Sequence, residues 1–190
     1  QVVDVRDGEI MFGLNMVVHK GKTIFVGDTS VHEYPTSEQM AEIAISTARV
    51  VRLFGFEPKV AFVSHSTFGQ PLTSRTKHIR KAVDILKEQK VDFEFDGDMQ
   101  PDVALNSEYE ELYPFSNIVG KANILIMPGQ HSAAISYKMM KTLGDTKVIG
   151  PLLIGLGLPV EIAPLRSSTS ELINLASIAA YSADIIDYKK

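Results

Sequence analysis

The sequence GKANILIMPGQHSAAISY, residues 120–137, decides the fold class. Residues 124–127 form a short apolar run that Pro128 and Gly129 end, which is typical of a buried strand closed by a turn. Helix-forming residues follow from 132 to 143. A strand that leads through a tight loop into a helix points backbone N–H groups and the positive end of the helix dipole at one spot. Ligands bind at that edge in open α/β sheets, although the same unit is also common as plain architecture.

Strand-like and helix-like segments alternate on both sides of this stretch. Apolar runs flank Gly21 and predict a hairpin, and the expected strands are residues 11–18, 23–26, 59–63, 93–95, 148–153 and 160–162. The first helix has Thr36 as its N-cap, Gln39 as the capping-box partner and Gly55 as its stop. The expected helices are residues 37–54, 74–90, 132–143 and 169–186. This alternation predicts an α/β fold with a largely parallel sheet covered by helices.

Composition limits the class of partner. The chain has 190 residues, 45% of them hydrophobic and 22% charged, as in a globular protein with a substantial core. A net charge of −4 gives no support to nucleic-acid binding, and no apolar run reaches the length that a membrane helix needs. The absence of cysteine excludes disulfides and thiolate catalysis and fits a reducing cytoplasm. Because the sequence starts at Gln1 inside an apolar alternating segment, we expect a piece of a longer polypeptide.

Two polar loops follow expected strands. Residues 64–69 offer hydroxyl and backbone N–H donors for a phosphate or carbonyl group from Ser64, Ser66, Thr67 and Gly69, or form a capped turn. Residues 96–98, with the sequence Asp-Gly-Asp, lie near Asp102 and are expected to form a turn or a loop that binds a cation or a basic ligand group. The alternative for these acidic residues is an ordinary surface turn.

Two helix starts are further candidates. Arg166, Ser167 and Ser168 precede the last helix and suit an anion, or they form an N-cap box with Glu171. Gly129, Gln130 and His131 open the helix that follows the central strand. The five histidines share no ligand spacing, so no metal site is expected, and the only ones in candidate loops are His65 and His131. No dinucleotide fingerprint, Walker loop or GxSxG elbow occurs. The residues alone predict one anion-binding cleft.

Ordered sequence blocks point to a family. The blocks FVGDTSVHEYPTSEQMAEIA, KVAFVSHSTFG, FDGDMQPDVAL, GKANILIMPGQHSAAISYK and IGPLLIGLGLPV occupy residues 25–44, 59–69, 95–105, 120–138 and 149–160. They resemble the phosphate acetyl/butyryl transferase (phosphotransacetylase) family. Within it, HEYPTSEQ, YPFSNIVGKAN and the Pro-Leu-Arg before the last helix are most similar to the C-terminal domain of bacterial hybrid NADP-dependent malic enzymes. In those proteins a malic-enzyme module precedes the transferase-like one.

The resemblance implies a fold and a domain plan. The fold is a three-layer α/β sandwich with a mostly parallel sheet, like that of isopropylmalate dehydrogenase and phosphotransacetylase, plus a long C-terminal helix. Residues 1–34 would be N-terminal strands that form a remnant of the first lobe and a connector. Residues 35–165 would be the second lobe, and residues 166–190 a helix that returns to the first lobe.

The resemblance also implies which transferase residues remain. An active member uses an Asp near the start of the last helix as base on the coenzyme A thiol, a Ser-Arg pair before that helix, and an Arg in the helix after a Pro-Asp-Leu loop. Here the base position holds Glu171, and Arg166 stands one place after the expected arginine. The Ser-Arg pair itself falls on Pro164 and Leu165, the helix arginine falls on Thr142, and the Pro-Asp-Leu loop reads Pro-Gly-Gln at residues 128–130. Two cationic positions are therefore lost or displaced.

Three functions are consistent with this pattern. The first is a regulatory and oligomerising module that binds acetyl-CoA or coenzyme A, in a homodimer or larger homo-oligomer. A malic-enzyme module in cis would then supply NADP and divalent metal, and the fragment alone would be inactive. The second is an active transferase with Glu171 as base and Arg166 as anion clamp. The third is a purely structural dimerisation domain, favoured by the apolar residues 148–163 and the Ala-rich last helix.

Overall fold

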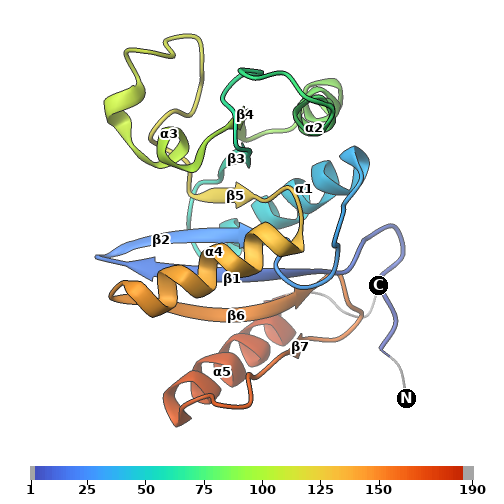
Figure 1. Ribbon diagram of the computed structural model, residues 1–190. Coiled ribbons are helices and arrows are strands. Elements are labelled where there is room, and N and C mark those ends of the chain that lie inside the picture. The colour runs from blue at the N-terminus through green and yellow to red at the C-terminus, as the bar shows by residue number, and fades with distance from the viewer. Residues whose placement is uncertain (1–2, 186–190) are drawn as a thin grey trace.

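One seven-stranded sheet forms the centre of the protein (Figure 1). The computed structural model describes residues 3–185. The strand order across the sheet is β4-β3-β5-β2-β1-β6-β7. The strands are β1 (Phe12–His19), β2 (Lys22–Gly27), β3 (Lys59–Val63), β4 (Glu94–Met99), β5 (Ile124–Ile126), β6 (Thr146–Ile154) and β7 (Val160–Glu161). The helices are α1 (Ser37–Leu53), α2 (Ser74–Gln89), α3 (Pro101–Leu105), α4 (Gln130–Leu143) and α5 (Thr169–Ile185), with a short 3-10 helix η1 (Ser107–Tyr109).

The sheet is mostly parallel, which confirms the prediction. The pairings of β4 with β3, of β3 with β5 and of β5 with β2 are parallel. The predicted hairpin joins β1 to β2 in antiparallel pairing, with Lys20 and Gly21 both at positive φ in its turn. Strand β6 pairs antiparallel with β1 and therefore runs in the same direction as β2, while β7 turns back along β6. The parallel strands thus end at one common edge.

Both faces of the sheet carry a hydrophobic core, so the molecule has three layers. Side chains alternate between the faces along each strand. In β5, Ile124 and Ile126 pack with helices α1 and α2, whereas Leu125 packs with α3 and α4 on the opposite face. Figure 1 shows α4 in front of the sheet and α1 behind it, with α5 and β7 beyond β6, at the end of the molecule opposite to β4. The predicted three-layer α/β architecture is confirmed.

Local sequence signals account for the two longest buried helices. Helix α1 begins with the predicted capping box, in which Thr36 accepts from the backbone N–H of Gln39, and it ends before Gly55, which has a φ of +82°. Helix α2 begins with a second capping box, from Thr73 and Thr76. Its buried apolar side chains recur at helical spacing, at Ile79, Val83 and Leu86. Each helix therefore meets the sheet with the face that its periodicity predicts.

One predicted loop is wrong. Asp96, Gly97 and Asp98 do not form a turn or a ligand loop but lie inside strand β4, which extends well past the expected residues 93–95. The pairing of β4 with β3 continues from Lys59↔Glu94 to Val63↔Met99. Tertiary pairing therefore overrides the turn preference of the Asp-Gly-Asp sequence. Other boundaries move by one to two residues, as in α4, which begins at Gln130 instead of 132.

Helices α4 and α5 are covered less completely than their sequences predict. In α4, Ala133 is the buried residue, and Met140 is 36% exposed. Helix α5 packs through Leu175, which joins the core of α1 and α2, while Leu172 and Ile173 are exposed. Within residues 3–185, no helix combines the length and the apolar character that crossing a membrane requires. Exposed apolar side chains remain on α4, on α5 and on the segment that joins β7 to α5, as at Leu143, Leu172 and Leu165.

Candidate functional site

The topology places a crevice between β3 and β5. From β3 the chain passes through α2, on one face, to β4; from β5 it passes through α4, on the other face, to β6. Adjacent parallel strands whose connections leave in opposite directions form the switch point at which open α/β sheets bind ligands. A crevice of about 350 Å³ lies at this edge, lined by Tyr34, Pro35, Thr36, Ser74, Arg75, His78, Ile79 and Pro128.

The sequence alone did not identify Arg75 and His78, the polar groups of this crevice, as site residues. The guanidinium carbon of Arg75 lies 5.7 Å from the centre of the Tyr34 ring, and within residues 3–185 Arg75 forms no ion pair. The His78 ring bridges two elements, with Nε2 2.8 Å from the Pro35 carbonyl oxygen and Nδ1 3.0 Å from Ser37 Oγ. A usable signal was present: the first turn of α2 contains no acidic residue, although acids are favoured there.

The loop at residues 64–69 does bind an anion, but the anion is a side chain of this protein. Asp98, fully buried in β4, accepts a short hydrogen bond from the Ser66 hydroxyl and another from the Gly69 N–H at 3.1 Å. Ser64 Oγ accepts from the Ser66 N–H, and the Thr67 hydroxyl accepts from the Gln100 N–H. Since Ser64, Ser66 and Thr67 are also buried, their hydroxyl groups hold the loop together.

A second buried carboxylate organises residues 28–34. Asp28 is 1% exposed and accepts backbone hydrogen bonds from Gly13 at 2.8 Å, Ser30 at 2.9 Å and His32 at 2.7 Å. The His32 ring also contacts the Asp28 carboxylate, with Nδ1 2.7 Å from Oδ2. From the sequence alone, residues 28–34 are expected to be a loop. An aspartate directly after a strand, followed by small polar residues, is a signal that could have indicated such an Asp-centred turn.

The start of α4 is closed by that same segment. The Gln130 N–H donates to the His32 carbonyl oxygen at 3.0 Å, and its side-chain amide donates to the Ser30 carbonyl oxygen at 3.2 Å. Gly129 precedes the helix with its Cα against the Glu33 carbonyl oxygen, where a Cβ would clash. The helix start is therefore partly satisfied by backbone carbonyls. His131 remains exposed beside it, as does His65 in the other loop.

Glu171 and its neighbours form a separate site at the other end of α4. The Glu171 carboxylate accepts from the Lys141 ammonium at 2.8 Å, and from the Ser168 backbone N–H at 2.8 Å and hydroxyl at 3.0 Å. These hydrogen bonds, with that from Lys141 the strongest, lower the pKa of Glu171 from 4.5 to about 2. Arg166 is exposed, and within residues 3–185 it forms no ion pair. Beside Glu171 lies a hollow of about 60 Å³ lined by Tyr137, Lys141, Ser167 and Asn174 among others.

The predicted site residues therefore fall into two groups rather than one cleft. Gln130 and Lys141 lie eleven residues apart on α4, which separates the two ends by about 16 Å along the helix axis. One group gathers around the switch point and contains residues 64–69 and 129–131. The other contains Arg166, Ser167, Ser168 and Glu171 around the end of α4. Among the described residues, no three His, Asp or Glu side chains are placed to hold a metal ion together.

Comparisons with known proteins agree on one family. The model of the phosphate acetyl/butaryl transferase family matches residues 1–180. An NADP-dependent malic enzyme of Rhizobium meliloti is 47% identical over 181 residues, which are 95% of this chain and 24% of that enzyme. A phosphate acetyltransferase of Clostridium acetobutylicum is 35% identical over 84% of this chain and 49% of its own length.

A solved structure gives the same result. A phosphotransacetylase from Streptococcus pyogenes superimposes with a TM-score of 0.90 and 30% sequence identity, covering 97% of this chain and 57% of its own. The chain thus spans about a quarter of the malic enzymes and about half of the phosphotransacetylases that it matches.

Proposed function

Because this chain belongs to the phosphate acetyl/butaryl transferase family, we propose that it is an acyl-CoA-binding regulatory module that has lost transferase activity. The malic enzymes that it matches contain it as a C-terminal part. A malic-enzyme module in cis would supply NADP and metal and would carry out the oxidative decarboxylation of malate. The ligand would be acetyl-CoA or free coenzyme A. The chain itself would hold no tightly bound cofactor, and the protein would work in the cytoplasm.

The state of Glu171 is the observation that carries this proposal. A transferase of this family needs a base that removes a proton from a thiol, whose ordinary pKa is about 8.5. A carboxylate with a pKa of about 2 is a poor acceptor for that proton. Its two oxygens already accept three hydrogen bonds, from Lys141 and from Ser168. The carboxylate then has the role of an N-terminal cap for α5 and a partner for α4.

The same region supplies groups that suit binding. Arg166 lies exposed next to Ser167, and the Ser167 hydroxyl is buried without a hydrogen-bond partner within residues 3–185. A thioester carbonyl or a phosphate oxygen could accept from that hydroxyl, and an arginine is the usual partner of a phosphate. We assign ligand contacts to Arg166, Ser167 and Ser168. At the switch point, Gly129, Gln130 and His131 could contact the ligand, while Ser64, Ser66, Thr67 and Gly69 shape the edge of the crevice.

Calorimetric titration with acetyl-CoA tests the proposal. We expect saturable binding to this chain, binding weakened about ten-fold or more by Arg166→Ala, and no formation of acetyl phosphate in a coupled assay. Lys77→Ala is the matched control, because it removes one exposed cation from α2 and should leave the affinity unchanged. Absence of acetyl-CoA binding would contradict the proposal and would favour a purely structural domain. Turnover that depends on phosphate and is abolished by Glu171→Gln would establish the alternative, an active acyltransferase.

A further inference from the structure

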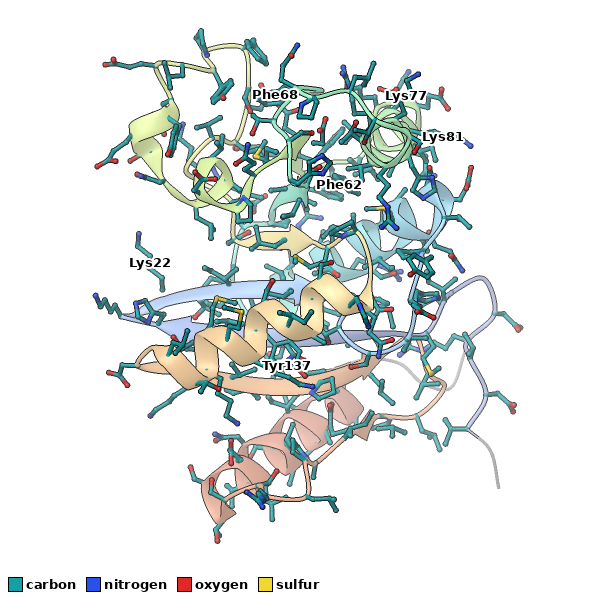
Figure 2. All side chains as sticks on the ribbon, in the orientation of Figure 1. Lys22, Phe62, Phe68, Lys77, Lys81 and Tyr137 are labelled. Atoms are coloured by element: carbon teal, nitrogen blue, oxygen red, sulfur yellow. The ribbon has the colours of Figure 1, made fainter. Side chains whose placement is uncertain are left out.

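A second hollow, outside both groups of site residues, lies between α2, β4 and the loop that follows η1. Its volume is about 410 Å³, within the range of small-molecule sites, and its apolar lining includes Phe68, Phe115 and Val83. It faces a different side of α2 from the switch-point crevice, which contacts Arg75, His78 and Ile79. In Figure 2, Phe68 lies between α2 and the loop after η1.

Aromatic rings form one wall of this hollow. The Phe68 and Phe115 ring centres are 4.8 Å apart, and the Tyr113 ring supports both at 5.5 and 6.2 Å. Phe115 is 66% exposed, which is unusual for a ring that is part of a cluster. Phe68 has a φ of +50°, a region that is costly for a bulky residue, and its N–H is held by the Asp98 carbonyl oxygen at 2.6 Å. The fold thus holds two rings at the surface at a local cost.

Two cationic side chains, Arg80 and Lys87, also line the hollow. The Arg80 guanidinium lies over Gly69, with Nη1 2.6 Å from the position that a Cβ would occupy there. Within residues 3–185, Arg80 has no carboxylate partner, so its five donors face the hollow and solvent. Lys87 also lines the hollow and is paired with Asp84 at 3.4 Å, both being exposed. An exposed pair of this kind is weak, and Lys87 can turn to an anionic ligand at little cost.

Hydrogen-bond acceptors complete the lining. Asp96 accepts from the Ser116 hydroxyl at 2.9 Å and from the Gly97 N–H at 2.9 Å, which fixes its carboxylate at the floor. A ring system stacked on Phe68 and Phe115 would bring an exocyclic amino group or a sugar hydroxyl within reach of such acceptors, and an attached phosphate would meet Arg80. Stacking surface, unpaired arginine and fixed acceptor together match one chemical class. We propose that this hollow binds a purine nucleoside phosphate.

Ligand-detected saturation-transfer NMR with AMP tests this proposal on the 190-residue chain. We expect saturable binding of AMP, weakened at least about five-fold by Phe115→Ala through loss of the stacking surface. Arg80→Ala should weaken AMP but leave adenosine unaffected, since only the phosphate meets the guanidinium. Lys77→Ala is the control: it removes a cation from the same helix, away from the hollow (Figure 2), and should change neither ligand. No saturable AMP signal at millimolar concentration, or AMP binding that both Phe115→Ala and Arg80→Ala leave unchanged, would overturn the proposal.

Competition with acetyl-CoA distinguishes the two sources of such a nucleotide. Displacement of AMP by acetyl-CoA, with both weakened by Phe115→Ala, would assign the hollow to the adenosine phosphate portion of coenzyme A. Simultaneous binding would assign it to a free nucleotide; either outcome supports a nucleotide site. The Arg166→Ala variant separates this inference from the proposed function, because it should weaken acetyl-CoA binding at the end of α4 and leave AMP binding intact.

Discussion

Asp28 and Asp98 are the residues around which the switch-point edge of the sheet is built. Asp28 directly follows β2 and Asp98 is the second-last residue of β4, and each is buried and accepts hydrogen bonds from the backbone of a neighbouring loop. A buried carboxylate is stable only when such donors surround it. Backbone N–H groups that the sequence suggested for an external phosphate therefore partly stabilise the protein's own carboxylates. The residues left for a ligand are those that face the crevice, such as Arg75.

Asp98→Asn tests this internal role. The substitution removes the charge and places an amide NH2 group where the Ser66 hydroxyl or the Gly69 N–H now donates, so one donor loses its acceptor. We expect a loss of about 1 to 3 kcal/mol in the free energy of unfolding, measured with urea. Asp84→Asn, in an exposed pair with Lys87, is the control and should change stability by no more than about 0.5 kcal/mol. Equal effects of both substitutions would contradict the assignment.

Glu161 makes stability depend on pH. Its Oε2 is buried without a hydrogen-bond partner among residues 3–185, and burial raises its pKa from 4.5 to about 8. Because the folded state holds the proton more tightly than the unfolded state, its contribution to stability is complete below pH 4.5 and is lost as pH rises through about 8. We expect the thermal midpoint of the protein to fall over this range and that of Glu161→Gln to fall less. Parallel curves for the two proteins would disprove the assignment.

Among the elements, α4 depends most on a contact with a distant segment. The Gln130 backbone N–H donates to the His32 carbonyl oxygen and the Gln130 side-chain amide donates to the Ser30 carbonyl oxygen. Gly129 permits that approach because a side chain there would collide with the Glu33 carbonyl oxygen. Its other contacts are few, since Ala133 is its buried residue. The position of α4, and with it the distance between the two groups of site residues, is set mainly at its N-terminus.

Gly129→Ala tests this dependence. The new methyl group should push α4 away from the segment before α1, cost about 1 to 3 kcal/mol, and expose the Gln130 amide to hydrogen exchange. Gly21→Ala is the control, because Gly21 also has a positive φ but has open space around it. It should lower stability by about 1 kcal/mol without changing exchange at Gln130. Retained protection of that amide in Gly129→Ala would contradict the proposed dependence.

At the scale of the whole molecule, exposed apolar side chains gather on α4, on α5 and just before α5. On α4, Ile135, Met139 and Leu143 recur every four residues and are all exposed, and Leu165, Leu172 and Ile173 are exposed at and before α5. Surfaces of this kind mark protein interfaces. They agree with the sequence-based hypothesis that the chain forms a homodimer or larger homo-oligomer and is one part of a larger polypeptide.

Sedimentation velocity tests self-association. We expect a dimer or larger species at micromolar concentration, and we expect Met139→Glu to weaken association about ten-fold or more, because it places a charge in the middle of the apolar stripe. Lys77→Glu, an exposed substitution on α2, should leave the association unchanged. A native chain that sediments as a monomer, or variants that behave alike, would remove α4 from the interface.

The sequence by itself determined the layers, the hairpin and the two long buried helices. Thr36, Gln39 and Gly55 act within a few residues of one another, and apolar periodicity is a property of each segment, so these features need no tertiary information. The ordered blocks also indicated the family, which the comparisons confirm.

Only the tertiary structure decided what the polar residues do. The Ser66 hydroxyl donates a hydrogen bond to Asp98, thirty-two residues away in the sequence. Lys141 donates one to Glu171, thirty residues away. The Asp-Gly-Asp sequence became a strand because β3 lies beside it, and Phe68 met Phe115 across two loops. Hydrogen bonds, buried charges and ring stacking depend on partners that the chain brings together only when it folds. For that physical reason, the sequence located the candidate residues, while their grouping into two sites and a separate hollow required the fold.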